Sequence, residues 1–202
     1  MTEATKLPES ALPVAQERSF DGFLHELEAP APSPCGGTAA AAAAAMAAAL
    51  VTMVARGSET WADGAGIASQ ARALRSRLIT LGDDDAAAFA RVIVTMRTPT
   101  GTPEQRDYAL GEALVRAAEV PLQIAEAAAD VAELAALAAA EGSPPLRPDA
   151  TAAAILAEAA VRAATHLVEI NLATVPGDQN SSHAEALAAA AATARLRALG
   201  QG

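Results

Sequence analysis

Apolar residues recur every three to four positions along most of this chain, which is the spacing of one face of an α-helix. The first run predicts a short helix that opens at Ser19, with an apolar face formed by Phe20, Phe23, Leu24 and Leu27. The alanine block from Ala39 to Ala49 predicts a second helix that extends to about Arg56 before Gly57 ends it. Because this helix is apolar on every side, we expect it to be buried.

Two further helices are predicted on either side of a break at Gly82 and Asp83. The helix before the break carries apolar residues at helical spacing, namely Ile67, Leu74, Leu78 and Leu81. The helix after it would be capped by Asp83, and the acidic residues through Asp85 would suit its positive N-terminus. Its apolar face is formed by Ala86, Phe89, Val92, Ile93 and Met96.

Start signals mark the remaining helices. The segment Thr102–Gln105 supplies an N-cap threonine, a proline at the first helical position and a glutamine that completes a capping box. The helix that it opens is expected to kink at Pro121 and to reach Gly142. The next helix begins near Asp149 after a proline-rich loop, and a second capping box, Ser182–Glu185, opens the last one.

The predicted fold is therefore all-α, a single domain of about seven mostly antiparallel helices over residues 19–202, behind a flexible tail over residues 1–18. Composition supports this, since 52% of residues are hydrophobic, only 2% are aromatic, and alanine forms helices well and strands poorly. Because each alanine buries little area, we expect many close helix contacts and a homodimer interface to stabilise the fold.

Charge and cysteine content exclude several classes of protein. A net charge of −10 argues against a nucleic-acid surface, which needs clustered Lys and Arg. The single cysteine, Cys35, excludes an internal disulfide, and with no signal peptide we expect a cytoplasmic protein. The segment 38–55 is long enough to span a bilayer, but alanine is weakly lipophilic, so we expect no membrane. The histidines, His25, His166 and His183, lack metal-ligand spacing.

The most chemically suggestive segment is the loop Pro32–Thr38, which leads directly into the alanine helix. Its prolines favour an extended approach, and Gly36 and Gly37 allow another group to come close to the backbone. Thr38 is predicted as the helix N-cap. Free N–H groups at a helix N-terminus favour an anion or a polar ligand edge. We therefore predict that the segment from Pro34 to Thr38 lines the principal pocket.

The order of motifs resembles one known family. The motifs are Phe23–Leu27, Pro32–Thr38, Met53–Val54, Asp85–Phe89, Ala118–Leu122, Asp149 and Ile170–Leu172. Together they resemble the cyclodeaminase/cyclohydrolase family, which includes the C-terminal domain of formiminotransferase-cyclodeaminase and stand-alone methenyltetrahydrofolate cyclohydrolases. The resemblance covers about residues 19 to 190. It implies antiparallel helices, a homodimer with a folate site near the subunit interface, a tetrahydrofolate derivative as substrate, and neither a metal nor a tightly bound cofactor.

The implied chemistry is attack of water on a cationic methenyl bridge or loss of ammonia from a formimino group. Several positions depart from the family pattern. Cys35 replaces a glycine, Thr38 a serine and Leu167 an asparagine, while Arg56–Trp61 replaces a lysine-rich stretch. The resemblance implies that the lost lysines would pair with the glutamate tail of folate or with a developing negative charge. Two alternatives therefore stay open: action on another small cyclic imine or amidine, or a non-catalytic helical binding protein.

Three residues are candidate catalytic groups. Asp85 would act as a base or bond an N–H-rich heterocycle, or would serve only its helix dipole. Cys35 would be a nucleophile with a lowered thiol pKa, or a small neutral replacement. His166 would be catalytic or simply bonded to a neighbouring side chain.

The remaining candidates would bind substrate. Arg97 is a basic candidate for an anionic tail, Asp149 a ligand-binding carboxylate or an N-cap, and Asn171 a ligand donor or a cap. With the loop residues, the predicted binding set is Pro34, Gly36, Gly37, Thr38, Arg97, Asp149 and Asn171.

Overall fold

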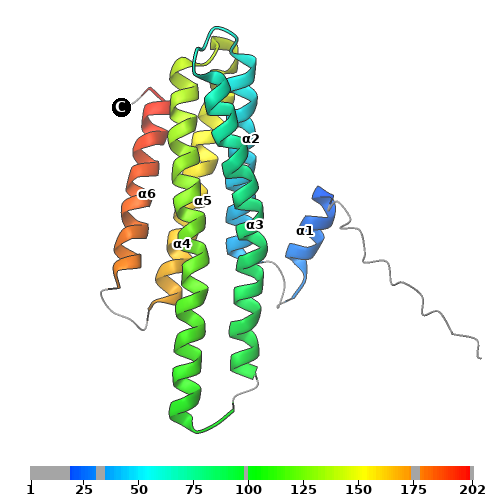
Figure 1. The fold of residues 1–202 in the computed structure, drawn as a ribbon, viewed down its shortest axis with the longest axis vertical. Coiled ribbons are helices and arrows are strands. Elements are labelled where there is room, and N and C mark those ends of the chain that lie inside the picture. Colours follow the sequence, from blue (N-terminus) through cyan, green and yellow to red (C-terminus); the bar gives the residue numbers. More distant parts are fainter. Residues whose placement is uncertain (1–18, 31–34, 98–99, 174–177, 201–202) are drawn as a thin grey trace, which may run out of the picture.

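The computed structural model describes residues 19–30, 35–97, 100–173 and 178–200. Within these ranges every regular element is helical, which confirms the predicted all-α fold (Figure 1). The predictions about the tail over residues 1–18 and about Pro34 lie outside the described residues. The elements are α1 (Phe20–Glu28), α2 (Gly36–Gly57), α3 (Gly64–Arg97), α4 (Pro103–Glu141), the 3-10 turn η1 (Pro144–Leu146), α5 (Arg147–Asn171) and α6 (Gln179–Ala198).

The helices α2 to α5 form an antiparallel bundle, α6 packs along α4 and α5, and α1 stands to one side (Figure 1). Helix lengths are unequal. The 39 residues of α4 span about 58 Å, whereas the 22 residues of α2 span about 33 Å. The end of α3 and the start of α4 therefore project beyond the bundle as a pair. We call this pair the arm and define it as residues 87–97 of α3 and 103–116 of α4.

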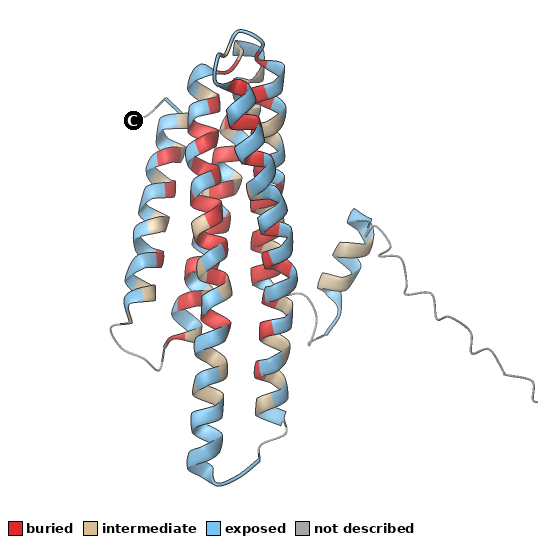
Figure 2. Cartoon of the chain, viewed as in Figure 1, coloured by how far each residue is buried: buried red, intermediate tan, exposed pale blue. Residues whose placement is uncertain are grey.

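Alanine dominates the core, as its frequency in the sequence predicted. Buried residues concentrate where α2, α3, α4 and α5 lie side by side, while the arm is mostly exposed or half-buried (Figure 2). The largest fully buried side chains include Leu78, Ile124 and Val51. Such small side chains let helix axes approach closely, so that many short contacts replace a few large ones.

The predicted break at Gly82 and Asp83 is wrong, because α3 continues through it without interruption. A glycine inside a helix costs about 1 kcal/mol relative to alanine, which is too little to end a long helix that packs along its neighbours. Gly82 faces α2, where a Cβ would make ordinary van der Waals contact with Ala41 and Thr38 at 3.5 Å. Two expected helices are thus one, and the described residues contain six α-helices. Asp85 consequently lies in the middle of α3.

The capping box at the start of α4 is confirmed. The Thr102 hydroxyl accepts from the backbone N–H of Gln105 at 3.4 Å, and the Gln105 side chain accepts from the backbone N–H of Thr102 at 2.9 Å. The helix continues through Pro121 to Glu141.

Three other predicted caps are wrong. Helix α2 begins three residues earlier than expected, with Cys35 instead of Thr38 as its N-cap, so Thr38 lies inside the first turn. Helix α5 starts at Arg147, because Pro148 fits a first helical turn, and Asp149 lies within that turn. The carboxylate of Asp178 accepts from the backbone N–H of Asn180 at 2.7 Å and caps α6, so the Ser182–Glu185 box lies inside the helix.

By length and composition, α2 and the segment Pro144–Asn171 are apolar enough to cross a membrane. Both lie within the bundle, where 56% and 44% of their most apolar windows are buried.

Candidate active site

A buried carboxylate from α3 meets the N-terminus of α2. Asp85 is 5% exposed, and its Oδ2 accepts the backbone N–H of Thr38 at 3.0 Å and the thiol of Cys35 at 3.2 Å. The Thr38 hydroxyl donates to the carbonyl oxygen of Gly82 at 2.9 Å and lies 3.5 Å from Oδ2. Cys35 makes no side-chain cap of its own, so Asp85 supplies the capping group of α2 from a different helix.

Gly37 is the residue that lets the carboxylate come this close. A Cβ on Gly37 would lie 2.2 Å from Oδ1 and 2.5 Å from Oδ2 of Asp85, far inside van der Waals contact. At Gly36 a Cβ would only touch Leu167 of α5, at 3.7 Å from Cδ1. The two glycines of the loop therefore differ, and only Gly37 is required to be glycine by the position of Asp85.

Burial governs the electrostatics of the site. It raises the pKa of Asp85, while the hydrogen bonds from Cys35 and Thr38 oppose that rise. Burial, followed by the charge of Asp85 and the hydrogen bond to it, raises the pKa of the Cys35 thiol to about 11. The lowered pKa expected for a nucleophilic thiol is therefore wrong for Cys35. Near neutral pH the thiol is protonated and donates to the carboxylate.

The two oxygens of Asp85 differ in their surroundings. Oδ2 is held by Cys35 and Thr38, whereas Oδ1 makes no hydrogen bond to the described residues. Oδ1 is nevertheless in contact with solvent. Every fully buried side-chain nitrogen or oxygen of the described residues has a hydrogen-bond partner, so an unbonded Oδ1 is not fully buried. A carboxylate with one anchored and one available oxygen, and with a raised pKa, is suited to take up and return a proton.

Three cavities lie towards this end of the bundle, and the residues that line them include neither Asp85 nor Cys35. One of about 360 Å³ lies between α1, α2 and α3 and is lined by Thr38, Gly82 and the phenyl rings of Phe20 and Phe23. One of about 710 Å³ lies between α3 and α4, beside Asp84. A third, of about 600 Å³, lies on α4 against the end of α5. The prediction that the segment from Pro34 to Thr38 lines the principal pocket is wrong for its described residues, because residues 35–38 line neither of the two larger cavities and Thr38 lines only the smallest.

Asn171 makes a structural bond that links two of the sequence motifs. Pro121 has no N–H, so the carbonyl of Ala117 one turn earlier loses its helical partner. Asn171, at the end of α5, donates its side-chain N–H to this carbonyl at 2.9 Å. Asn171 also lines the 600 Å³ cavity, where its remaining polar groups are available. The proline of one motif thus explains the asparagine of the other.

The other predicted residues lie away from Asp85. His166 is exposed on α5, where its Nδ1 lies 3.8 Å from a carboxylate oxygen of Glu169. Arg97 is exposed at the tip of the arm, about 18 Å along α3 from Asp85. Asp149 lies at the opposite end of the bundle, where the backbone N–H of Ser143 donates to Ser58 at 2.8 Å, about one α2 length from Cys35. Within one chain, therefore, these three residues do not lie beside the Asp85 carboxylate.

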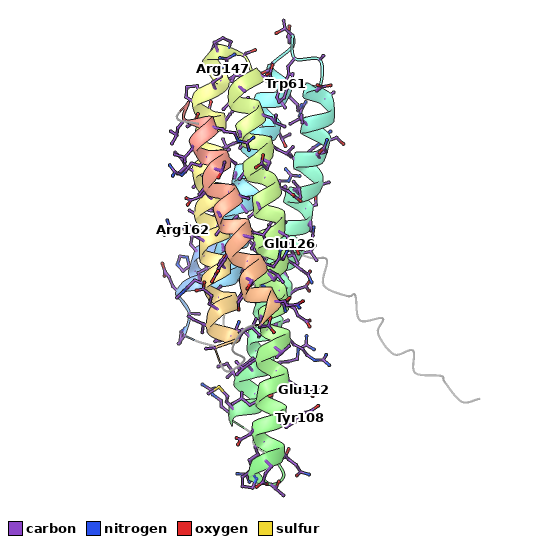
Figure 3. The ribbon with its side chains drawn as sticks, turned by 90° about the vertical axis from the view of Figure 1, so that its left-hand side faces the viewer. Trp61, Tyr108, Glu112, Glu126, Arg147 and Arg162 are labelled. Carbon is purple, nitrogen blue, oxygen red and sulfur yellow. The ribbon has the colours of Figure 1, made fainter. Side chains whose placement is uncertain are left out.

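Two arginines that the sequence did not single out lie closer. Arg91 and Arg116 line the 710 Å³ cavity from α3 and α4, and their guanidinium groups make no ion pair or hydrogen bond with the described residues. Glu119 and Asp84 share this cavity. Arg116 also lines the 600 Å³ cavity, together with Tyr108 and Glu112 of the arm (Figure 3). The available signal was the position of Arg116 just before the Ala118–Leu122 motif, which itself contains Glu119.

Metal ligation finds no support in the described part of the chain, where no group of three His, Cys, Asp or Glu side chains could hold a metal ion.

Comparisons with known proteins agree with this arrangement. A family model described as formiminotransferase-cyclodeaminase matches residues 19–193. The chain is 33% identical over 168 residues to the methenyltetrahydrofolate cyclohydrolase of Methylorubrum extorquens, covering 78% of this chain and 81% of that protein. It is 34% identical over 120 residues to the formimidoyltransferase-cyclodeaminase of Mus musculus, covering 54% of this chain and 22% of that longer protein.

Among solved structures, the fold matches the crystal structure of formiminotetrahydrofolate cyclodeaminase from Thermotoga maritima. The TM-score is 0.79 at 25% sequence identity, over 91% of this chain and 94% of that chain. The resemblance drawn from the order of the motifs is thereby confirmed. Because the family model, the sequence identity and the fold all match over most of its length, the chain belongs to the formiminotransferase-cyclodeaminase family.

Proposed function

We propose that this protein hydrolyses the methenyl bridge of a tetrahydrofolate one-carbon adduct, with Asp85 as the general base. The observation that carries the proposal is the carboxylate at the start of α2, with Oδ2 anchored and Oδ1 available. The similarity to a cyclohydrolase along most of both chains supports the same reaction class.

The proposed reaction needs one base and one negative charge. Water attacks the cationic methenyl carbon while Oδ1 of Asp85 takes one of its protons. The resulting adduct carries a hydroxyl group, and breaking one C–N bond leaves a formyl group on the other nitrogen. Asp85 then returns its proton to the released nitrogen, and the hydroxyl proton leaves to solvent. A carboxylate in a poorly solvated position also stabilises the positive charge of the bridge before attack.

A second substrate is a formimino adduct, which would lose ammonia as its one carbon closes onto the neighbouring nitrogen. The structural match to a formiminotetrahydrofolate cyclodeaminase favours testing it. The same carboxylate would move protons in both reactions, so the two assays use one site.

The carboxylates of the folate glutamate tail need cationic partners. The structure offers Arg91 and Arg116, whose guanidinium groups make no ion pair with the described residues. Arg91 is about 9 Å along α3 from Asp85, half the distance to Arg97. A planar guanidinium binds a carboxylate through two hydrogen bonds. We therefore assign the tail to these two residues in place of the expected lysines.

We also propose a cytoplasmic homodimer that needs no tightly bound cofactor. Apolar residues on the arm are highly exposed, with Val94 62%, Met96 60% and Tyr108 69% exposed. Exposed apolar groups gathered on a projecting element favour contact with a second copy. A single thiol, protonated and half-buried, is consistent with a reducing compartment.

The test is the loss of methenyltetrahydrofolate absorbance with and without purified protein, at a pH where spontaneous hydrolysis is slow. We expect clear acceleration that is proportional to protein concentration. The formimino substrate is assayed in parallel, with ammonia release as the readout. Folded protein that accelerates neither reaction would overturn the proposal and favour a different cyclic imine or amidine.

A further inference from the structure

Cys35 is the single cysteine of the chain, and its thiol points at the proposed base. Its Sγ lies 3.2 Å from Oδ2 of Asp85, which also accepts the backbone N–H of Thr38. The thiol is the nearer of two side-chain donors to Oδ2, since the Thr38 hydroxyl lies 3.5 Å from Oδ2 and makes its shorter hydrogen bond, of 2.9 Å, to the carbonyl oxygen of Gly82. The orientation of the carboxylate therefore depends mainly on the backbone N–H of Thr38 and on the Cys35 thiol.

The thiol remains a donor over the whole range in which a carboxylate titrates. Burial and the neighbouring carboxylate raise the pKa of Cys35 to about 11, so its proton stays in place at neutral and acidic pH. A nucleophile needs the opposite shift. A neutral S–H that donates to a carboxylate favours the ionised form of that carboxylate and lowers its pKa. In this site it acts against burial, which raises the pKa of Asp85.

No other charged group on the neighbouring helices replaces the thiol in lowering the pKa of Asp85, as far as the described residues extend. From α2 the titratable group in contact is Cys35, and from α5 the residue at the first turn of α2 is the apolar Leu167. On its own helix Asp83 and Asp84 are exposed. On α4, Arg116 and Glu119 line the same cavity as Asp84. Neither residue is among the groups that shift the pKa of Asp85.

We propose that Cys35 is a positioning residue: its thiol fixes Oδ2 of Asp85 so that Oδ1 faces the reacting carbon in the ionised, proton-accepting form. This inference rests on the proposed function, in which Asp85 is the base. Cys35 itself touches no reacting atom. Its removal should leave Asp85 held by the backbone N–H of Thr38 and by the longer contact to the Thr38 hydroxyl, so that the carboxyl group is harder to ionise and less fixed in orientation.

The experiment compares Cys35→Ala and Cys35→Ser with wild type and with Ser76→Ala, which removes an exposed hydroxyl from α3 outside the site. The first readout is kcat/KM for methenyltetrahydrofolate as a function of pH. Because the base must be ionised, Cys35→Ala should lose activity about 3- to 10-fold on the acidic side and regain most of it as pH rises. Cys35→Ser keeps a hydroxyl donor and should stay within about 3-fold of wild type at every pH.

The second readout does not depend on turnover. The carboxyl ¹³C signal of Asp85, assigned by its absence in Asp85→Asn, is titrated in the full-length protein. We expect Cys35→Ala to raise the pKa of Asp85 and Cys35→Ser to leave it near the wild-type position. If wild type turns over no folate, the proposed function fails. The titration still shows whether the hydrogen bond from the Cys35 thiol lowers the pKa of Asp85.

Three results would overturn the role of Cys35. One is an Asp85 titration that is the same in wild type and Cys35→Ala. Another is an activity loss in Cys35→Ala that is equal at every pH, which indicates a structural role only. The third is loss of activity in Cys35→Ser to the level of Asp85→Asn, which would indicate that Cys35 acts as a nucleophile. If Cys35→Ala does not fold, the comparison of Cys35→Ser with wild type carries the test.

Discussion

The pairing of Pro121 with Asn171 makes a sharp prediction about stability. Pro121 deprives the carbonyl of Ala117 of its helical donor, and the Asn171 side chain replaces that donor at 2.9 Å. Asn171→Ala should leave this carbonyl without a partner at a position where Ala117 is only 5% exposed. A buried carbonyl left unpaired costs about 1–3 kcal/mol of unfolding free energy.

The second mutation of the cycle restores the missing donor. In Pro121→Ala the new backbone N–H can bond to the carbonyl of Ala117 within α4. The Asn171 side chain then becomes dispensable, and its removal should cost about 0.5 kcal/mol or less. The coupling free energy between the two sites should therefore be about 1–2 kcal/mol, which exceeds the scatter of about 0.3–0.5 kcal/mol for independent sites.

The assay is urea unfolding followed by circular dichroism, at one protein concentration because a dimer would make stability concentration-dependent. The matched control is Pro148→Ala, at the start of α5, where a missing N–H leaves no helical carbonyl unpaired. Its coupling to Asn171→Ala should be near zero. A coupling below about 0.3 kcal/mol for Pro121 and Asn171 would refute the reasoning and return Asn171 to a purely ligand-binding role.

Four shorter predictions concern the site and the assembly. Gly37→Ala should displace the carboxylate of Asp85 and lower both activity and melting temperature, whereas Gly36→Ala, which meets only Leu167 at 3.7 Å, should do neither. Burial raises the pKa of Asp85, so the protonated carboxyl group stabilises the folded state below the ordinary pKa, and this stabilisation is lost as pH rises through the folded-state pKa. Asp85→Asn does not titrate, so its unfolding free energy should increase relative to that of wild type over this pH range. Equal pH profiles of stability would contradict the burial argument. Arg116→Gln should raise KM for methenyltetrahydrofolate with little change in kcat, while the same change at the ion-paired Arg162 should alter neither. Sedimentation at micromolar concentration should give a dimer, and a monodisperse monomer would refute it.

Sequence reasoning identified the helices well because alanine content and apolar spacing are local properties. It placed a break at Gly82 because glycine usually ends helices, yet here α3 continues through Gly82 and packs against Thr38 and Ala41 of α2. That contact spans more than forty residues of sequence and leaves no local signal. The start of α2 was misplaced for a related reason, since its capping group comes from α3 rather than from Thr38.

In the candidate site, too, local features could be predicted from the sequence and long-range contacts could not. Asp85 was chosen as a residue at a helix N-terminus, and it does serve one, but the helix is α2 rather than its own. Its link to Cys35 required two distant loop and helix positions to meet. Asp149 was selected by its place in the order of the motifs, and His166 as a histidine beside Leu167; the fold places neither of them beside Asp85. Motif order reports ancestry, whereas proximity depends on packing.

The most direct test of the account compares methenyltetrahydrofolate hydrolysis by wild type and by Asp85→Asn, with both shown to be folded by circular dichroism. A base in contact with the attacking water contributes about 10²- to 10⁴-fold, so kcat/KM should fall by at least about 100-fold while the melting temperature stays the same or rises. Equal activity in the two proteins would contradict the account and leave Asp85 as the cap of α2 alone.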